Sequence, residues 1–361
     1  MEFADIQSVL LYRNIIKVIA LSMLAFVFSM AWTPVLTHFL FKYGVKAKIK
    51  QKSVDGKKAP IFFNLHKEKA GTPLMGGLLV WMTVLILALF FKMMNNLFGG
   101  IWQEIDFLSR SQTWLPLFAL VTTGLLGVVD DIKSTKGWGS NKGGGVRFLY
   151  RFWWLFLVAL LGSLWFFYKL EVSTVHLPGL GDFEIGWWYI PFFIFIILST
   201  AISSNETDGL DGLNGGVLLT AFSVFGTIAF VQDRIDLAAF CAVIVGGLLA
   251  FLWFNVHPAR FFMGDTGAIS LGAVLGVIAL ITDSVFVLPI VCFIYLVEST
   301  SVIIQLTSKR LFGKKVFLSA PFHHHLQAIG WPESKIVMRM WILSGVFGVV
   351  GLIFGIFGMG K

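Results

Sequence analysis

Residues 235–254 read IDLAAFCAVIVGGLLAFLWF, and Asp236 is the single charged residue among them. About 20 consecutive apolar residues allow an α-helix to cross the hydrocarbon core of a bilayer. Similar apolar stretches recur along the chain, which predicts an all-α polytopic membrane protein with about ten transmembrane helices. The predicted spans lie near residues 15–41, 74–94, 114–129, 147–168, 187–203, 214–231, 235–254, 266–282, 284–306 and 336–358.

The composition supports a membrane protein. Of the 361 residues, 57% are apolar and 13% are charged, whereas a soluble domain typically carries about 25% charged residues. The two cysteines, Cys241 and Cys292, lie inside apolar runs. They are typical of small buried residues and form neither a disulfide framework nor a zinc motif. We expect residues 1–361 to form one integral membrane domain, with no soluble domain attached.

The distribution of Lys and Arg predicts the orientation of the chain in the membrane. The loops after the odd-numbered spans hold 21 of the 28 basic residues, and the other side holds seven. Because basic loops stay in the cytoplasm, both termini should lie outside, in the periplasm or beyond the cell. The net charge of +8 is thereby explained by topology, and nucleic-acid binding is not needed. The basic loops are residues 42–69, 131–151, Arg260 and 307–339.

Residues 169–186 differ from the apolar spans on either side. They combine β-forming residues with the turn residues Pro178, Gly179 and Gly181. This pattern predicts a short β-hairpin on the outer face.

The unusual polar residues gather on the cytoplasmic face, although they are spread over 195 residues of sequence. They lie in Asp130-Asp131, in the turn 205–214, in the connection 255–267 and in the run His323-His324-His325. Any one of these carboxylates could be a helix cap, since Asp and Asn commonly cap helices. Adjacent carboxylates repel one another, and a divalent cation commonly holds such groups together. Oxygen ligands beside a phosphate substrate favour Mg²⁺ over zinc, so the group predicts a magnesium-dependent site.

The histidine run and two glycine runs each have more than one interpretation. Consecutive helical residues point in different directions, so one zinc ion cannot easily bind all three histidines; phosphate donation or acid–base catalysis fits better. Gly143-Gly144-Gly145 is more typical of a flexible loop than of a phosphate-binding loop. Gly76-Gly77 is expected to permit close helix packing, with Lys69 facing the site. Glu298, inside an apolar span, is either a structural hydrogen-bond centre or part of a polar cavity.

At these residues the sequence resembles the phospho-N-acetylmuramoyl-pentapeptide transferases, within the superfamily of polyprenyl-phosphate N-acetylhexosamine-1-phosphate transferases. The resemblance covers nearly the whole chain, and its specificity comes from the order and combination of the motifs. It implies ten helices, a cleft that faces the cytoplasm of a bacterial inner membrane, dependence on Mg²⁺ and a homodimer. The motifs are Gly71-Thr72-Pro73 with Met75-Gly76-Gly77, Asp130-Asp131, Asn205 to Leu213, Phe262-Met263-Gly264-Asp265 and Ala320-Pro321-Phe322-His323-His324-His325.

The resemblance also implies roles for single residues. Asp265 looks like the Mg²⁺ ligand, together with the pair Asp130 and Asp131, which would position or deprotonate the lipid phosphate. His323 looks like the catalytic member of the histidine run. The remaining positions resemble residues that bind the nucleotide and diphosphate, with Phe262 suited to stacking on uracil: Lys69, Asn205, Asp208, Asp211, Asn255, Phe262, Gln305, His324 and His325.

The implied reaction is attack by undecaprenyl phosphate on the β-phosphorus of UDP-MurNAc-pentapeptide, which gives lipid I and UMP for peptidoglycan synthesis. Direct attack and a two-step route through a phospho-aspartate both fit these residues. One position departs from the family pattern: the family usually has Leu where this chain has Glu206. That carboxylate could contact the metal or face solvent.

Two other functions are considered. A sister enzyme would transfer a sugar phosphate from UDP-GlcNAc for other surface glycans, but the uninterrupted histidine run favours the muramoyl branch. An ion-coupled transporter would carry acids near the middle of the bilayer in repeated halves. Here the acids lie at one interface, and no repeat is visible.

Overall fold

The computed structural model describes residues 2–46, 63, 67–109, 112–138 and 146–358. Within them, eight helices are long and apolar enough to cross a membrane, and a helix pair bent by 82° at Cys292 brings the number to nine if the pair crosses as one span. A shorter apolar helix, Asp265–Ile281, completes the set. The prediction of an all-α polytopic membrane protein is confirmed. That residues 1–361 form one domain stays a prediction.

The helical bounds differ from the predicted spans mainly at their ends. The predicted span 114–129, which stops just before Asp130-Asp131, is too short: the helix continues to Lys136 and stops at Gly137, in the left-handed conformation with φ 73°. The first helix begins at Glu2 rather than near residue 15. The α-helices are α1 (Glu2–Lys42), α3 (Leu78–Phe98), α4 (Ile101–Ile105), α5 (Trp114–Lys136), α6 (Phe148–Leu164), α7 (Tyr189–Thr207), α8 (Leu213–Val231), α9 (Ile235–Asn255), α10 (Asp265–Ile281), α11 (Leu288–Val291), α12 (Phe293–Phe312), α13 (Phe322–Ala328) and α14 (Glu333–Phe357).

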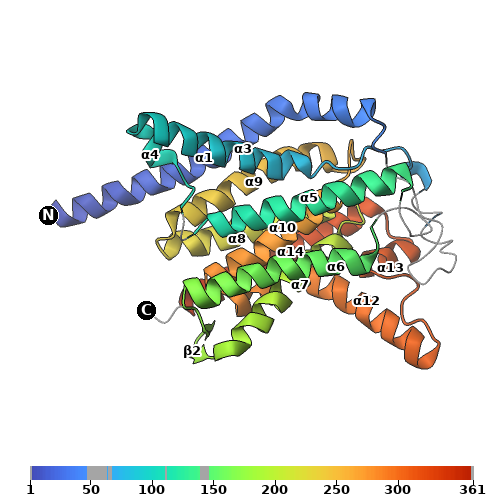
Figure 1. The fold of residues 1–361 in the computed structure, drawn as a ribbon. Helices are drawn as coiled ribbons and strands as arrows, with labels where there is room; N and C mark the ends of the chain where they lie inside the picture. Colours follow the sequence, from blue (N-terminus) through green and yellow to red (C-terminus); the bar gives the residue numbers. More distant parts are fainter. Residues whose placement is uncertain (1, 47–62, 64–66, 110–111, 139–145, 359–361) are drawn as a thin grey trace.

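Helix α10 lies at the centre of the bundle, between α5, α7 and α8 (Figure 1). Every residue from Thr266 to Ile281 is buried. A helix that is apolar on all sides is stable only when other helices surround it or lipid covers it, and here neighbouring helices do so. Its first residue, Asp265, is thereby fixed at one end of the most enclosed helix of the molecule.

The predicted hairpin at 169–186 is present. Strands β1 (Thr174–Leu177) and β2 (Gly181–Glu184) pair antiparallel, with Val175 opposite Phe183. The two chain ends and this hairpin lie at one end of the bundle, and α13 lies at the other (Figure 1). Both termini are therefore on the same side, as the ten predicted crossings would require. That this side faces outward rests on the distribution of Lys and Arg.

Candidate active site

The cytoplasmic end of α3 docks on the connection between α9 and α10. Gly76 N donates to Phe262 O at 2.7 Å, and Gly77 N donates to Met263 O at 2.9 Å. A Cβ atom on Gly77 would lie 2.3 Å from Gly267 Cα, which no real contact allows. The absence of a side chain lets the two backbones touch, as the close packing predicted for Gly76-Gly77 requires. This contact fixes the loop that precedes Asp265.

The N-terminus of α10 is capped by a residue from another helix. The carboxylate of Asp131, on α5, accepts from Asp265 N and from Thr266 N, both at 3.1 Å. A carboxylate is stabilised at this helix end by the free N–H groups and the helix dipole. Gly264 precedes the helix with φ 74°, a conformation that favours glycine. Asp131 is buried, and both its oxygens are used in holding α10 in place.

Arg151, near the start of α6, joins two of the predicted site residues. Its NH1 lies 3.0 Å from Asp130 Oδ2 and 2.6 Å from Asp265 Oδ2. Asn205, from the end of α7, donates to Asp265 Oδ1 at 2.6 Å, and the backbone N–H of Val146 donates to Asp130. Three helices thus bring their oxygen-bearing groups to one point. The sequence interpretation missed Arg151, which stands in the aromatic run of residues 148–154 and is separated from Asp265 by 114 positions.

Asp208 adds a further carboxylate, from the turn between α7 and α8. Its Oδ2 accepts from Gly264 N at 3.1 Å. Loss of water around the group, followed by the charge of Asp265, raises the pKa of Asp208 from 3.8 to about 7. At neutral pH this side chain can therefore hold or release a proton, as a general acid or base must.

Lys69 lies in a second, adjoining cluster. Its Nζ is 2.7 Å from Asp211 Oδ1 and 2.5 Å from Glu333 Oε1. His257 Nδ1 is 2.9 Å from Asp211 Oδ2. Burial alone would raise the pKa of Asp211, but Lys69 and the hydrogen bonds from its neighbours outweigh it and lower that pKa. The half-buried ring of Phe262 lies with its centroid 5.8 Å from Lys69 Nζ.

The Lys69 cluster contains two residues that the sequence interpretation did not select, His257 and Glu333. His257 precedes Pro258 in the connection from α9 to α10, and Glu333 follows Pro332 at the first turn of α14. Both positions suggest local roles in a turn or a helix start. Their contacts with Asp211 span 46 and 122 positions and are visible only in the folded chain.

Two predicted substrate-binding residues use their amides to hold loops. Asn255 accepts from Gly212 N at 2.9 Å and donates to Phe261 O at 2.8 Å. Gln305 donates to Phe317 O at 2.9 Å and accepts from the backbone N–H of Val316 and Phe317 at 3.0 Å. Both side chains are buried. The structure assigns them to shaping the surroundings of the site.

The histidine run lies in the short helix α13. His323 is fully buried, and its Nδ1 lies 3.0 Å from Glu298 Oε2. Its Nε2 has no hydrogen-bond partner among the described residues. A Cβ atom on Gly209 would lie 2.2 Å from that nitrogen, so the imidazole packs directly against the turn that carries Asp208 and Asp211.

The other two histidines point elsewhere. His324 Nδ1 lies 2.9 Å from Gln327 Oε1, whereas His325 Nδ1 accepts from Leu318 N at 3.3 Å. The three rings thus face different neighbours, in agreement with the argument against a shared zinc ion. Glu298 is the structural hydrogen-bond centre, one of its two expected roles, because it accepts from both the backbone N–H and the ring of His323.

Glu206 departs from both roles considered for it. Its Oε2 accepts from Ser299 Oγ at 2.7 Å, so the carboxylate turns from the Asp265 cluster toward α12 and is half-buried. The loop prediction for Gly143–Gly145 lies outside the described residues.

The donor set fits a hard divalent cation better than zinc. Asp130, Asp208, Asp265 and Asn205 offer carboxylate and amide oxygens, which Mg²⁺ prefers. The position of the Arg151 guanidinium between Asp130 and Asp265 marks where positive charge is stabilised. Among the described residues, two groups place three ligand atoms of His, Asp or Glu within 4.8 Å of one another, and neither contains Asp130, Asp208 or Asp265. One of the two, Asp211-His257-Glu333, surrounds Lys69. The lysine supplies the cation there.

Comparison with known proteins agrees with this site. The model of a family described as glycosyl transferase family 4 matches residues 113–283, which include Asp130, Asp208 and Asp265. A phospho-N-acetylmuramoyl-pentapeptide-transferase of Chloroflexus aurantiacus is 36% identical over 307 residues, covering 80% of each chain. The enzyme of that name from Chloroflexus aggregans is 33% identical and covers 96% of this chain and 92% of its own. A third, from Pelagibacter ubique, is 37% identical over 79% of this chain and 80% of its own.

Proposed function

Because the chain belongs to the phospho-N-acetylmuramoyl-pentapeptide transferases, we propose that the oxygen cluster at the N-terminus of α10 is its catalytic centre. The enzyme transfers phospho-MurNAc-pentapeptide from UDP-MurNAc-pentapeptide to undecaprenyl phosphate in the bacterial cytoplasmic membrane, forming lipid I and UMP. The observation that supports the site most strongly is the meeting of Asp130, Asp208 and Asp265, from three separate segments, at one end of the bundle.

We propose Mg²⁺ as the cofactor, held by Asp265 and Asp130 with Asn205 beside them. When bound, the ion would neutralise the negative charge of the two phosphate substrates as they approach. Asp131 belongs to the same centre, but its carboxylate holds the backbone of Asp265 and Thr266. We therefore assign Asp131 a positioning role in place of the direct metal contact suggested by the sequence.

The side chains supply charge and proton transfer. Arg151, placed between Asp130 and Asp265, stabilises negative charge on the reacting phosphates. Asp208 Oδ2 accepts a backbone hydrogen bond, so its other oxygen, Oδ1, is where a proton would be held. With a pKa of about 7, Asp208 can take the proton of a monoprotonated acceptor phosphate before attack.

The Lys69 cluster is assigned to the nucleotide. Uracil would stack on the half-buried ring of Phe262, and the diphosphate would draw Lys69 from its carboxylate partners, Asp211 and Glu333. The two acids thus hold the lysine in place until a phosphate competes for it. Asn255 and Gln305 shape the surrounding loops through their backbone contacts.

His323 is assigned a positioning role. It is fully buried against Gly209, and Glu298 orients its ring. The imidazole thereby fixes the turn from Asp208 to Asp211. This turn supplies Asp208 to the oxygen cluster and Asp211 to the Lys69 cluster. Its substitution should lower transfer while conservative changes at neighbouring His325 have little effect. A homodimer, implied by the family motifs, is also part of the proposal, and native mass spectrometry of the purified protein would test it.

The donor can be tested directly. Membranes containing the chain are incubated with undecaprenyl phosphate and either radiolabelled UDP-MurNAc-pentapeptide or radiolabelled UDP-GlcNAc. We expect a butanol-soluble lipid product, released UMP and Mg²⁺ dependence with the muramoyl donor. Product from UDP-GlcNAc alone would instead place the chain with the sister enzymes for other surface glycans.

A further inference from the structure

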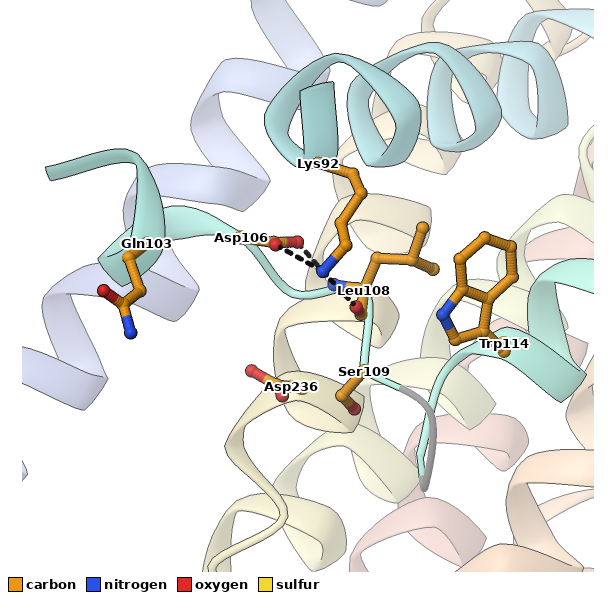
Figure 2. A pocket seen from close by; sticks show the side chains of 7 residues that line it. All are labelled: Lys92, Gln103, Asp106, Leu108, Ser109, Trp114 and Asp236. Atoms are coloured by element: carbon orange, nitrogen blue, oxygen red, sulfur yellow. Dashed lines mark hydrogen bonds and ion pairs between the residues drawn. The ribbon is translucent and has the colours of Figure 1, made fainter. Parts of the chain in front are cut away.

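A cavity of about 440 Å³ lies at the outer end of the bundle, far from the catalytic centre. Trp114, which begins α5, lines it, and Asp130 lies 16 residues further along the same helix. At 1.5 Å per residue, about 24 Å therefore separate the two sites. The volume falls within the range of small-molecule sites, roughly 300–1,000 Å³. The lining residues are Lys92, Gln103, Asp106, Leu108, Ser109, Trp114 and Asp236 (Figure 2).

Two ion pairs lie side by side at this cavity. Lys92 Nζ is 3.1 Å from Asp106 Oδ2, and Lys17 Nζ is 3.2 Å from Asp236 Oδ1. One member of each pair stays accessible to water: the side chains of Lys92 and Asp236 are 35% and 29% exposed, whereas that of Asp106 is 6% exposed. The cavity therefore offers a partly free cation and a partly free anion. This arrangement suits a ligand that carries both charges.

Uncharged hydrogen-bonding groups complete the lining. The Oγ of Ser109 is buried and has no hydrogen-bond partner among the described residues. A buried hydroxyl without a partner is costly, and a bound ligand would satisfy it. Gln103 on α4 is exposed, and Figure 2 shows its side chain on one side of the Asp106–Lys92 pair and Trp114 on the other.

The surroundings of the cavity indicate a lipid. Leu97, Phe98 and Ile101 lie between the lining residues Lys92 and Gln103 in the sequence and are 65–73% exposed. Trp102 and Trp114 lie where α4 and α5 begin, at the outer end of the spans. Tryptophan is characteristic of the level of the phospholipid headgroups, and exposed apolar side chains are suited to acyl chains.

We propose that this cavity binds the headgroup of a zwitterionic aminophospholipid of the outer leaflet. The primary ammonium would donate hydrogen bonds to Asp236 and Gln103, and the phosphate would face Lys92 and Ser109. A quaternary ammonium, as in phosphatidylcholine, has no N–H to donate, and the anionic headgroup of phosphatidylglycerol has no amine. This inference is independent of the proposed function.

The test uses the purified full-length protein and native mass spectrometry with equimolar palmitoyl-oleoyl phosphatidylethanolamine and phosphatidylcholine. The wild type should retain the ethanolamine lipid about tenfold better, the effect of one charge-assisted hydrogen bond. Asp236→Asn should abolish that preference, and Gln103→Ala should reduce it about threefold. Asp233→Asn is the matched control, because Asp233 is an exposed acid in the turn just before α9 and does not line the cavity; it should change nothing.

Transfer of phospho-MurNAc-pentapeptide should continue in all three variants, which verifies their folding. Glycerophosphoethanolamine without acyl chains, added as competitor, should displace the lipid at high concentration because it carries the same headgroup. Equal retention of the two lipids by the wild type, or equal loss of preference in Asp233→Asn and Asp236→Asn, would overturn the proposal. If Asp236→Asn does not fold, an unchanged preference in Gln103→Ala overturns it.

Discussion

The acidic residues at the two ends of the bundle have different partners. At the outer end several acids have a basic partner of their own, as in Lys92–Asp106, Lys17–Asp236 and His176–Asp182. At the cytoplasmic end Asp130, Asp131, Asp208 and Asp265 gather on one helix terminus, and Arg151 bridges two of them. One-to-one pairs are complete within the protein, whereas gathered carboxylates repel and favour an added cation or proton. The difference separates a structural end from a catalytic end.

The largest effect is expected at Asp265. Asp265→Asn keeps the size of the side chain but removes the charge that Arg151 and the proposed Mg²⁺ require. Lipid I formation should fall at least about a thousandfold at saturating Mg²⁺, the scale of losing a key electrostatic group. The rate is measured with radiolabelled UDP-MurNAc-pentapeptide. Asp182→Asn, at the largely exposed acid of the outer hairpin, serves as control and should keep the wild-type rate.

Arg151 should show the next largest effect. Arg151→Met removes the cation from between Asp130 and Asp265 and should lower kcat about a hundredfold, because charge on the reacting phosphates is no longer stabilised. Arg151→Lys keeps the charge but not the planar guanidinium, so about a tenfold loss is expected. Equal activity of the Met variant and the wild type would show that the bridge is only structural.

The titration of Asp208 predicts a pH effect on stability. Its raised pKa means that the folded protein favours the protonated form. The contribution of this group to the stability of the fold is therefore greatest below about pH 4. That contribution is lost as the pH rises through about 7. Asp208→Asn should remove this part of the pH dependence and melt at a higher temperature than the wild type at pH 8. Thermal unfolding in detergent between pH 5 and pH 8 measures the difference.

The smallest effect is expected at His176, in the outer hairpin. Its Nε2 lies 2.6 Å from Gly358 O and its Nδ1 lies 2.5 Å from Asp182 Oδ1. Both partners accept hydrogen bonds, so both ring nitrogens donate only when the imidazole is protonated.

Although burial opposes the charge, these contacts with Asp182 and Gly358 raise the pKa of His176 above 6.5. The contact stabilises the fold below pH 6.5 and weakens as the pH rises through the raised pKa. The melting temperature of the wild type should exceed that of His176→Gln by about 2 °C at pH 6, and the difference should vanish near pH 9. An advantage that grows with pH would contradict the protonated form.

Hydropathy and charge predicted much of this molecule because they act locally. The apolar run of residues 235–254 became α9, and the turn residues near Gly179 became the hairpin. The distribution of basic loops predicted that Asp130, Asp208 and Asp265 lie on the same, cytoplasmic face of the membrane. These are properties of short segments. The bilayer adds the requirement that backbone polar groups pair within the protein, which helices satisfy.

Pairings between distant segments could not be predicted in the same way. Arg151 looked like one more basic residue of a cytoplasmic loop, and Glu333 like the first-turn acid of a helix. Asp131 looked equivalent to Asp130, yet it faces the N–H groups of α10 while Asp130 faces Arg151. Adjacent residues on a helix point about 100° apart, so their roles depend on which neighbour each one meets.

Binding of a divalent cation by the purified protein tests whether the gathered carboxylates form a metal site. Mn²⁺ serves as the probe, and electron paramagnetic resonance measures its free concentration during titration of the purified protein. We expect saturable binding that Mg²⁺ competes away and that weakens at least about tenfold in Asp265→Asn and Asp130→Asn, but not in Asp182→Asn. Equal Mn²⁺ affinity in the wild type, Asp265→Asn and Asp130→Asn would contradict the assignment of the gathered carboxylates as the metal-dependent catalytic centre.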